Sequence, residues 1–165
     1  MVLNTRNFGE IEIDDRKIIT FQDGIPGFFD DRHFVLFKHG MEETDEFEDD
    51  TDSEEDYFWW LQSVDDGDVA FVLMDVFMVM PDYEPHVDDE EMDLLGEYDP
   101  EHFVVYNIVS ISDDPAKISV NLKAPIIINV KERIGRQVVA ENEDYPIRYS
   151  IAKVLEQKQQ KGRWQ

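Results

Sequence analysis

Carboxylates and histidines are the residues of this 165-residue chain that could carry out chemistry, and neither set is arranged for it. With 39 Asp and Glu residues some pairs lie close by chance, so a glycosidase-like carboxylate pair is not predicted. The histidines do not share metal-ligand spacing on a helix, and the absence of cysteine excludes thiolate metal sites. They are His33, His39, His86 and His102.

Motifs for nucleophilic or phosphate chemistry are also missing from the sequence. No serine lies in a Gly-x-Ser-x-Gly elbow, and no glycine-rich phosphate loop precedes a predicted helix. We therefore predict no catalytic residue, no metal and no cofactor, and we favour a binding protein over an enzyme. A carbohydrate-active β-barrel enzyme is the enzymatic alternative, which an assay for activity on sugars would reveal.

Residues 42–56 form a strongly acidic run, which we expect to be a flexible insertion. Eleven of its fifteen residues are acidic, none is basic, and Phe47 is its single large apolar side chain. Its spacing partly resembles a calcium loop, but Glu55 and Leu61 stand where that loop needs Gly and a bidentate Glu. The acidic residues are Glu42, Glu43, Asp45, Glu46, Glu48, Asp49, Asp50, Asp52, Glu54, Glu55 and Asp56.

The formal net charge of -24 limits the classes of partner that this protein can attract. Free nucleic acid and anionic membrane surfaces are repelled by such a field, whereas basic protein surfaces are attracted. The N-terminal residues lack the apolar core of a signal peptide, and no stretch approaches eighteen apolar residues. We predict a cytoplasmic protein, monomeric when alone, with a basic protein partner and without direct nucleic-acid or membrane binding.

The apolar pattern predicts a mainly β chain. About nine short strands are expected, including residues 8–13, 17–21, 33–37, 57–62, 69–74, 103–111, 117–121 and 126–128. The first two are expected to pair as a hairpin, and Gly135 to turn the chain back after the last. Asp88 and Gly96 bound one short predicted helix. Because closure removes exposed edges, we predict a small closed or nearly closed antiparallel β-barrel with one short helix.

We expect one domain over residues 1–149, followed by a polar tail at residues 150–165. Within the domain, two glycines flank a proline in the segment Gly24–Phe28, which predicts a tight bend. We expect Phe28 and Phe29 to turn inward and anchor this bend.

Several motifs follow one another in an order that is specific as a set. They are Gly24–Phe28 (GIPGF), Leu61–Ser63 (LQS), Phe77–Tyr83, Asn121–Asn129 (NLKAPIIIN), Gly135–Gln137 (GRQ) and Tyr145–Arg148 (YPIR). Over roughly residues 3 to 149 the chain resembles the flagellar assembly factor FliW family. It departs from the family at the acidic run, which looks like an insertion. It also departs at Val76, where the family tends to have proline in an Asp-Pro-Phe sequence, and this affects the turn at Asp75–Phe77.

The resemblance implies a non-enzymatic regulator with a compact β-barrel-like fold. Proteins of this family bind the RNA-binding translational repressor CsrA away from its RNA surface and relieve its repression of flagellin mRNA. They also bind flagellin, which competes for them. The alternative is a secretion chaperone or adaptor that holds flagellin-like subunits and has no role in translation.

The candidate partner-binding residues lie between Asp65 and Tyr83. We expect the charge partners to be Asp65, Asp66 and Asp75, and the apolar anchors to be Phe71, Phe77, Met78 and Met80. For each apolar residue, burial in the core is the alternative. We further expect the acidic run at 42–56 to strengthen the exclusion of RNA phosphates from a bound partner.

Overall fold

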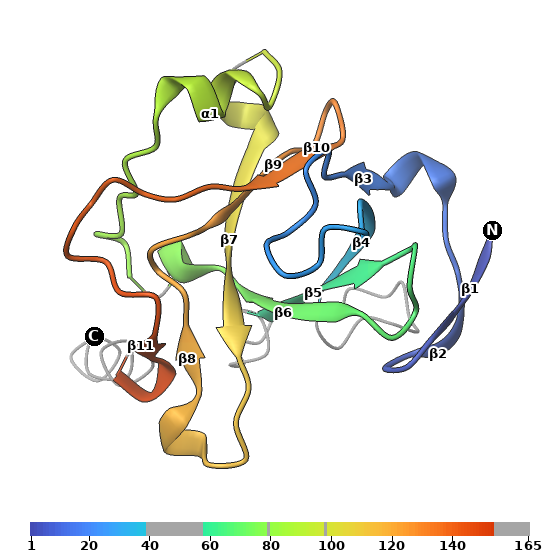
Figure 1. Ribbon diagram of the computed structural model, residues 1–165, viewed down its shortest axis with the longest axis horizontal. Coiled ribbons are helices and arrows are strands. Elements are labelled where there is room, and N and C mark those ends of the chain that lie inside the picture. The colour runs from blue at the N-terminus through green and yellow to red at the C-terminus, as the bar shows by residue number, and fades with distance from the viewer. Residues whose placement is uncertain (39–57, 79, 98, 154–165) are drawn as a thin grey trace, which may run out of the picture.

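The computed structural model describes residues 1–38, 58–78, 80–97 and 99–153. The acidic run at 42–56 lies outside these ranges, as do residues 154–165 of the tail predicted at 150–165. The described chain is mainly β, with the short helix α1 (Asp89–Asp93) and a helical turn at 151–153 (Figure 1). The strands are β1 (Val2–Thr5), β2 (Gly9–Glu12), β3 (Ile19–Thr20), β4 (His33–Lys38), β5 (Phe58–Ser63), β6 (Ala70–Met74), β7 (Phe103–Ser110), β8 (Ser119–Val120), β9 (Ile126–Asn129), β10 (Ile134–Gln137) and β11 (Tyr149–Ser150).

Seven of these strands close into a barrel, which confirms the predicted fold class. The ring runs β7, β6, β5, β4, β3, β10 and β9, and returns to β7. The long strand β7 closes it, because its first half pairs with β9 and its second half with β6. Strands β8 and β11 extend the sheet beside β7, while β1 and β2 form a separate hairpin.

One junction of the barrel differs from the predicted antiparallel pairing. Strand β10 pairs in parallel with β3 through Ile134 and Thr20. The chain reverses before β10, at a turn in which Arg133 has a positive φ of 59°, and not at Gly135 as predicted. Gly135 lies within β10, where the ring of Phe21 packs against it so closely that an added Cβ would come within 2.5 Å of that ring. Glycine is therefore needed here for close packing of the barrel wall.

The barrel interior holds apolar side chains from six of its strands and from the β3–β4 loop. They are Ile19, Phe21, Ile25, Phe34, Leu61, Leu73, Tyr106, Ile126 and Ile128. Strand β9 shows how the alternation of a strand divides its side chains between two faces. Ile126 and Ile128 enter the interior, while Ile127 packs outside the barrel with Leu95 and Val138. Burial of each such isoleucine stabilises the fold by roughly 2 kcal/mol.

The predicted hairpin between residues 8–13 and 17–21 is wrong. Strand β2 pairs with β1, and β3 pairs with β4 and β10. The cause lies at Asp14, whose side chain accepts a hydrogen bond from the backbone of Arg16 at 2.9 Å and caps a 3₁₀ turn at Asp15–Lys17. This turn separates β2 from β3 and prevents the tight connection of a hairpin.

The predicted helix is present as α1. The side chain of Asp88 accepts a hydrogen bond from the backbone of Glu90 at 2.9 Å, and Gly96 has a positive φ of 89° where the segment ends. A five-residue helix is too short to be stable alone, so its packing through Met92 stabilises it. Within the described ranges, no helix has the length and apolar composition needed to span a membrane.

Candidate protein-interaction site

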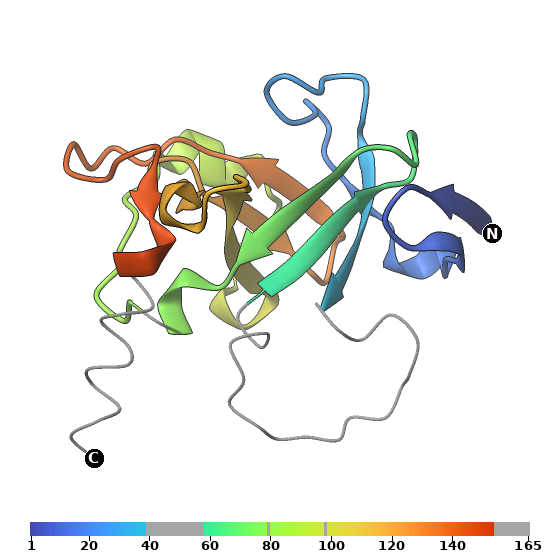
Figure 2. The same ribbon diagram turned by 90° about the horizontal axis from the view of Figure 1, so that it is seen from below.

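The predicted partner-binding residues lie at the two ends of strand β6. Asp65 and Asp66 occupy the turn between β5 and β6, and Phe71 is the second residue of β6. Asp75 follows the far end of the strand and precedes a 3₁₀ turn at Val76–Met78. Figure 2 shows the two ends of β6 at separate places on the molecule. The fold therefore divides these residues into two groups.

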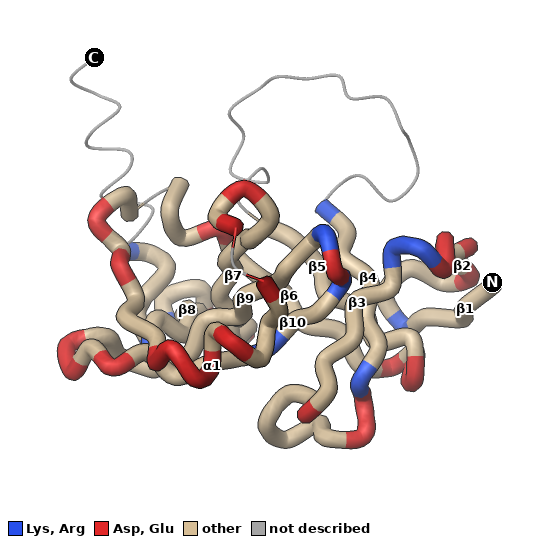
Figure 3. The backbone as a smooth tube through the Cα atoms, turned by 90° about the horizontal axis from the view of Figure 1, so that it is seen from above, with Lys and Arg blue, Asp and Glu red and all other residues tan. Residues whose placement is uncertain are grey.

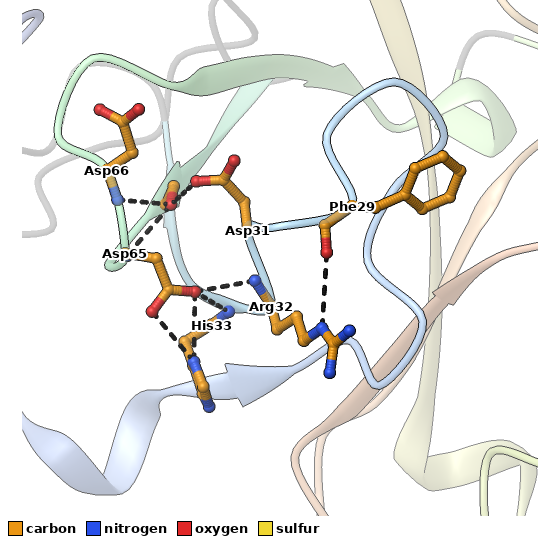
Figure 4. Close-up of polar contacts among 7 residues, drawn as sticks. Phe29, Asp31, Arg32, His33, Asp65 and Asp66 are labelled. Atoms are coloured by element: carbon orange, nitrogen blue, oxygen red, sulfur yellow. Dashed lines mark hydrogen bonds and ion pairs between the residues drawn. The ribbon is translucent and has the colours of Figure 1, made fainter.

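Asp65 is held in a cluster of hydrogen bonds at the start of β6 (Figure 4). Its Oδ2 accepts hydrogen bonds from the backbone N–H groups of Arg32 at 2.8 Å and His33 at 3.0 Å, and the His33 Nδ1 lies 3.2 Å from each carboxylate oxygen. Burial acts to raise the pKa of Asp65, but these hydrogen bonds together outweigh it and lower the pKa below 3.8. The carboxylate already has partners inside the protein.

Ser63 connects a second carboxylate to the same cluster. Its hydroxyl donates a 2.6 Å hydrogen bond to buried Asp31, and the same oxygen accepts the backbone N–H groups of Asp65 at 3.1 Å and Asp66 at 3.0 Å. We call Asp31, Ser63, Asp65 and Asp66 the clamp, because they tie the β3–β4 loop to the β5–β6 turn.

Phe28 and Phe29 project from the clamped loop, and the prediction that they turn inward is wrong. Their exposed fractions are 41% and 60%. The position inside is taken by Ile25, which is fully buried with the barrel core. Phe28 instead packs edge-on against half-buried Phe71, with ring centroids 5.1 Å apart. Phe71 is therefore a support for this loop.

At the far end of β6, burial separates the remaining candidates. Asp75 is partly enclosed, and burial raises its pKa above 3.8 although the backbone N–H groups of Met78 and Phe77 act in the opposite direction. Val76, at the position where the family tends to have proline, is fully buried at the start of the 3₁₀ turn. Met80 packs against the core cluster that contains Val76. Phe77 and Met78 remain 38% and 52% exposed.

Phe77 is one of the residues that line a groove of about 860 Å³ on the outside of the barrel. The floor of the groove comes from Phe103 and Val105 of β7 and from Ile127 of β9. Its walls come from the chain before α1 and from α1 itself. The described residues that line it are Phe77, Tyr83, Glu84, Pro85, Val87, Asp89, Met92, Asp93, Pro100, Phe103, Val105 and Ile127, which we call the groove.

The charged residues among the described lining of the groove are all acidic. Glu84, Asp89 and Asp93 are exposed, and none forms an ion pair within the part of the chain that the structure describes. In contrast, the neighbouring Glu91 accepts a 2.7 Å hydrogen bond from Arg136, which also pairs with Asp23. Figure 3 shows acidic positions gathered on and around α1. The groove thus combines an apolar floor with an acidic rim that forms no ion pair among the described residues.

Buried hydrogen bonds fix Tyr83, which lines the groove. Its hydroxyl donates to the carbonyl of Leu122 at 2.7 Å and accepts from Asn107 Nδ2 at 2.9 Å. Burial raises the pKa of Tyr83 to about 12, so it stays protonated and donates at neutral pH. The ring of Phe77 lies 5.4 Å from the ring of Tyr83, which supports its exposed position.

Sequence reasoning found Phe77 but missed most of the groove. Its floor joins residues more than twenty positions apart, and no local motif marks them. The alternation within β7 and β9 was the available signal, because it places Phe103, Val105 and Ile127 on one face once the strands pair. In the described ranges, no group of three or more His, Cys, Asp or Glu residues is arranged to hold a metal ion. The groove offers apolar contacts and negative charge to a partner.

This fold and surface define a class of protein: a closed β-barrel that carries an apolar groove bordered by acidic residues on its outer wall. The family model described as "FliW protein" matches residues 2–151. The chain therefore belongs to the FliW family of flagellar assembly factors.

Relatives and a solved structure agree with this assignment. A flagellar assembly factor FliW from Thermoanaerobacter pseudethanolicus is 39% identical over 156 residues, which cover 94% of this chain and 95% of the relative. One from Caldicellulosiruptor saccharolyticus is 39% identical over 160 residues, covering 97% and 96%. A crystal structure of the flagellar assembly factor FliW matches with a TM-score of 0.75 and 32% identity, covering 91% of this chain and 96% of that one.

Proposed function

We propose that this protein is a non-enzymatic, cytoplasmic regulator of flagellar assembly that acts by binding other proteins. It binds the translational repressor CsrA away from the RNA surface, antagonises its binding to RNA and relieves repression of flagellin synthesis. Flagellin is the competing partner, so secretion of flagellin frees the protein to capture CsrA. Membership of the FliW family over residues 2–151 is the observation that carries this proposal.

The charge of the chain supports this choice of partner. An RNA-binding protein presents basic surface, and a protein of net charge -24 is steered towards it. Once docked, the acidic surface also repels RNA phosphates, and this repulsion adds to any conformational effect on the repressor. Both effects weaken as salt screens the charges.

Within the candidate residues, exposure favours Phe77 and Met78 as the apolar anchors. Met80 packs in the core and Phe71 supports the clamped loop, so their contribution to binding is indirect. Asp66 and Asp75 remain proposed charge partners. Asp65 already accepts internal hydrogen bonds, so it contributes to partner binding through its negative charge alone.

The acidic run at 42–56 is proposed to strengthen RNA exclusion. Replacing its eleven acidic residues with Asn and Gln removes close to half of the net negative charge of the protein. We expect this variant to displace RNA from CsrA less effectively than the unaltered protein, most visibly at low salt. Unchanged displacement at low salt would remove the run from the mechanism.

The test of the function is a titration of the full-length protein into a CsrA–RNA complex at two salt concentrations. RNA release together with a protein–protein complex is expected, with a smaller effect at high salt. Absence of a complex with CsrA at both salt concentrations would contradict the proposal. It would favour the alternative, a flagellin-binding chaperone or adaptor without a role in translation.

A further inference from the structure

The groove presents the face of a sheet to its occupant, and not a strand edge. Phe103 and Val105 are two residues apart on β7, and Val105 pairs with Ile127 across β9. Their side chains therefore share one face, and all three line the groove. A segment that adds to a sheet needs backbone groups along an edge, so contact with this floor is made through side chains.

An amphipathic helix satisfies the demands of such a floor. Its backbone hydrogen bonds are internal, so it can offer a ridge of apolar side chains without leaving polar groups unpaired. The acidic rim adds a second requirement. Glu84, Asp89 and Asp93 are exposed at the groove and form no ion pair with described residues, so their charges attract a cationic ligand.

We propose that the groove binds an amphipathic helix of a partner protein, with apolar side chains on the floor and Lys or Arg on the flanks facing the rim. This inference rests on the proposed function only for the assignment of the helix to a regulatory partner. The recognition chemistry comes from the groove itself. Phe77 and Met92, which line the groove, contact the apolar face, and Asp89 and Asp93 face the cationic flank.

Three labelled peptides and the full-length protein test this chemistry by fluorescence polarisation. The first is an 18-residue peptide with Leu along one helical face and Lys on the flanks. The second has the same residues in an order that destroys the helical period, and the third has Glu in place of Lys. We expect the second and third to bind at least tenfold more weakly than the first. Equal binding of the first two would overturn the proposal, because it would show attraction by charge alone.

Variants of the protein place the peptide in the groove. Met92→Gln and Phe77→Ser are expected to weaken binding of the first peptide at least tenfold. Leu94→Gln is the matched control, because Leu94 is 51% exposed beside α1 but does not line the groove. Equal effects of Met92→Gln and Leu94→Gln would overturn the assignment to the groove.

Charge variants keep the test independent of folding. The double variant Asp89→Asn, Asp93→Asn should weaken binding severalfold at low salt. The control Glu10→Gln, Glu12→Gln removes the same charge from strand β2, away from the groove (Figure 1), and should have a smaller effect. Equal effects would overturn the role of the rim.

Two further outcomes concern the occupant and the function. Sedimentation of a dimer that Met92→Gln dissociates would overturn the proposal by making a second copy of this chain the occupant. Peptide binding without any complex with CsrA would leave the helix site intact and reject only the proposed partner. If the groove variants lose peptide binding but still form a complex with CsrA, the helix site stands and CsrA binds outside the groove.

Discussion

The two ends of strand β6 carry similar residues and use them differently. At its start, the carboxylates of Asp31 and Asp65 accept hydrogen bonds from within the protein and tie a loop to the barrel. At its end, the groove has carboxylates that form no ion pair with another described residue, beside an apolar floor. The number of acidic residues in a region therefore does not locate a binding surface. The internal partners of each carboxylate decide whether it stabilises the fold or remains available to a ligand.

The clamped loop gives the largest predicted effect, through Gly24. Its φ is +69°, and an added Cβ would lie 2.8 Å from the Cα of Phe29. We expect Gly24→Ala to lower the free energy of unfolding by about 3 kcal/mol, from backbone strain and close packing together. Denaturant unfolding followed by tryptophan fluorescence measures this loss.

Gly27 in the same loop is the matched control for Gly24. It also has a positive φ, +89°, but an added Cβ would have no neighbour within 4 Å. Gly27→Ala should therefore cost about 1 kcal/mol, from backbone strain alone. Equal losses for the two variants would contradict the close packing of the loop around Phe29.

The hydroxyl of Ser63 gives the next effect. Ser63→Ala leaves buried Asp31 without its 2.6 Å donor and two turn N–H groups without their acceptor. We expect a loss of about 2 kcal/mol in the free energy of unfolding. In Ser112→Ala, which removes the acceptor of one exposed hydrogen bond of 3.2 Å, the loss should stay below about 0.5 kcal/mol. Similar losses in both variants would show that the clamp does not stabilise the fold.

The two aspartates that flank β6 should respond to pH with opposite signs. The pKa of Asp65 is lowered on folding, so its contribution to stability is present above the ordinary value of 3.8 and is lost as pH falls through the lower folded pKa. The pKa of Asp75 is raised on folding, so the folded state binds more protons and stability falls as pH rises from 3.8 through the folded pKa.

Unfolding curves over a pH series separate these two contributions. Asp65→Asn should flatten the loss of stability on acidification below pH 3.8, although the partial exposure of Asp65 makes this effect small. Asp75→Asn should instead remove a decline in stability above pH 3.8. The same change of slope in both variants would contradict the difference between the two ends of β6.

Local patterns predicted the strands and the helix, because their signals lie within a few residues. The apolar run of β9 and the cap at Asp88 are examples, and both elements appear where expected. Positions that depend on distant packing were not predictable in this way. Gly135 is needed within a strand because the ring of Phe21 packs against it. Phe28 points outward because Ile25 fills the interior. The groove floor forms only after β7 and β9 pair, so the alternation within each strand does not by itself bring its residues together.

The smallest predicted effect on stability lies at the groove end. Asp89→Asn with Asp93→Asn should change the free energy of unfolding by less than about 0.5 kcal/mol, because both side chains are exposed and have no ion pair among the described residues. Denaturant unfolding at low and high salt measures this change. A loss comparable to that of Ser63→Ala would show that the rim also stabilises the fold. A near-zero change, combined with the expected loss of peptide binding, would instead show that the carboxylates at the groove contribute to binding and not to stability. The carboxylates of the clamp would then differ from them by stabilising the loop.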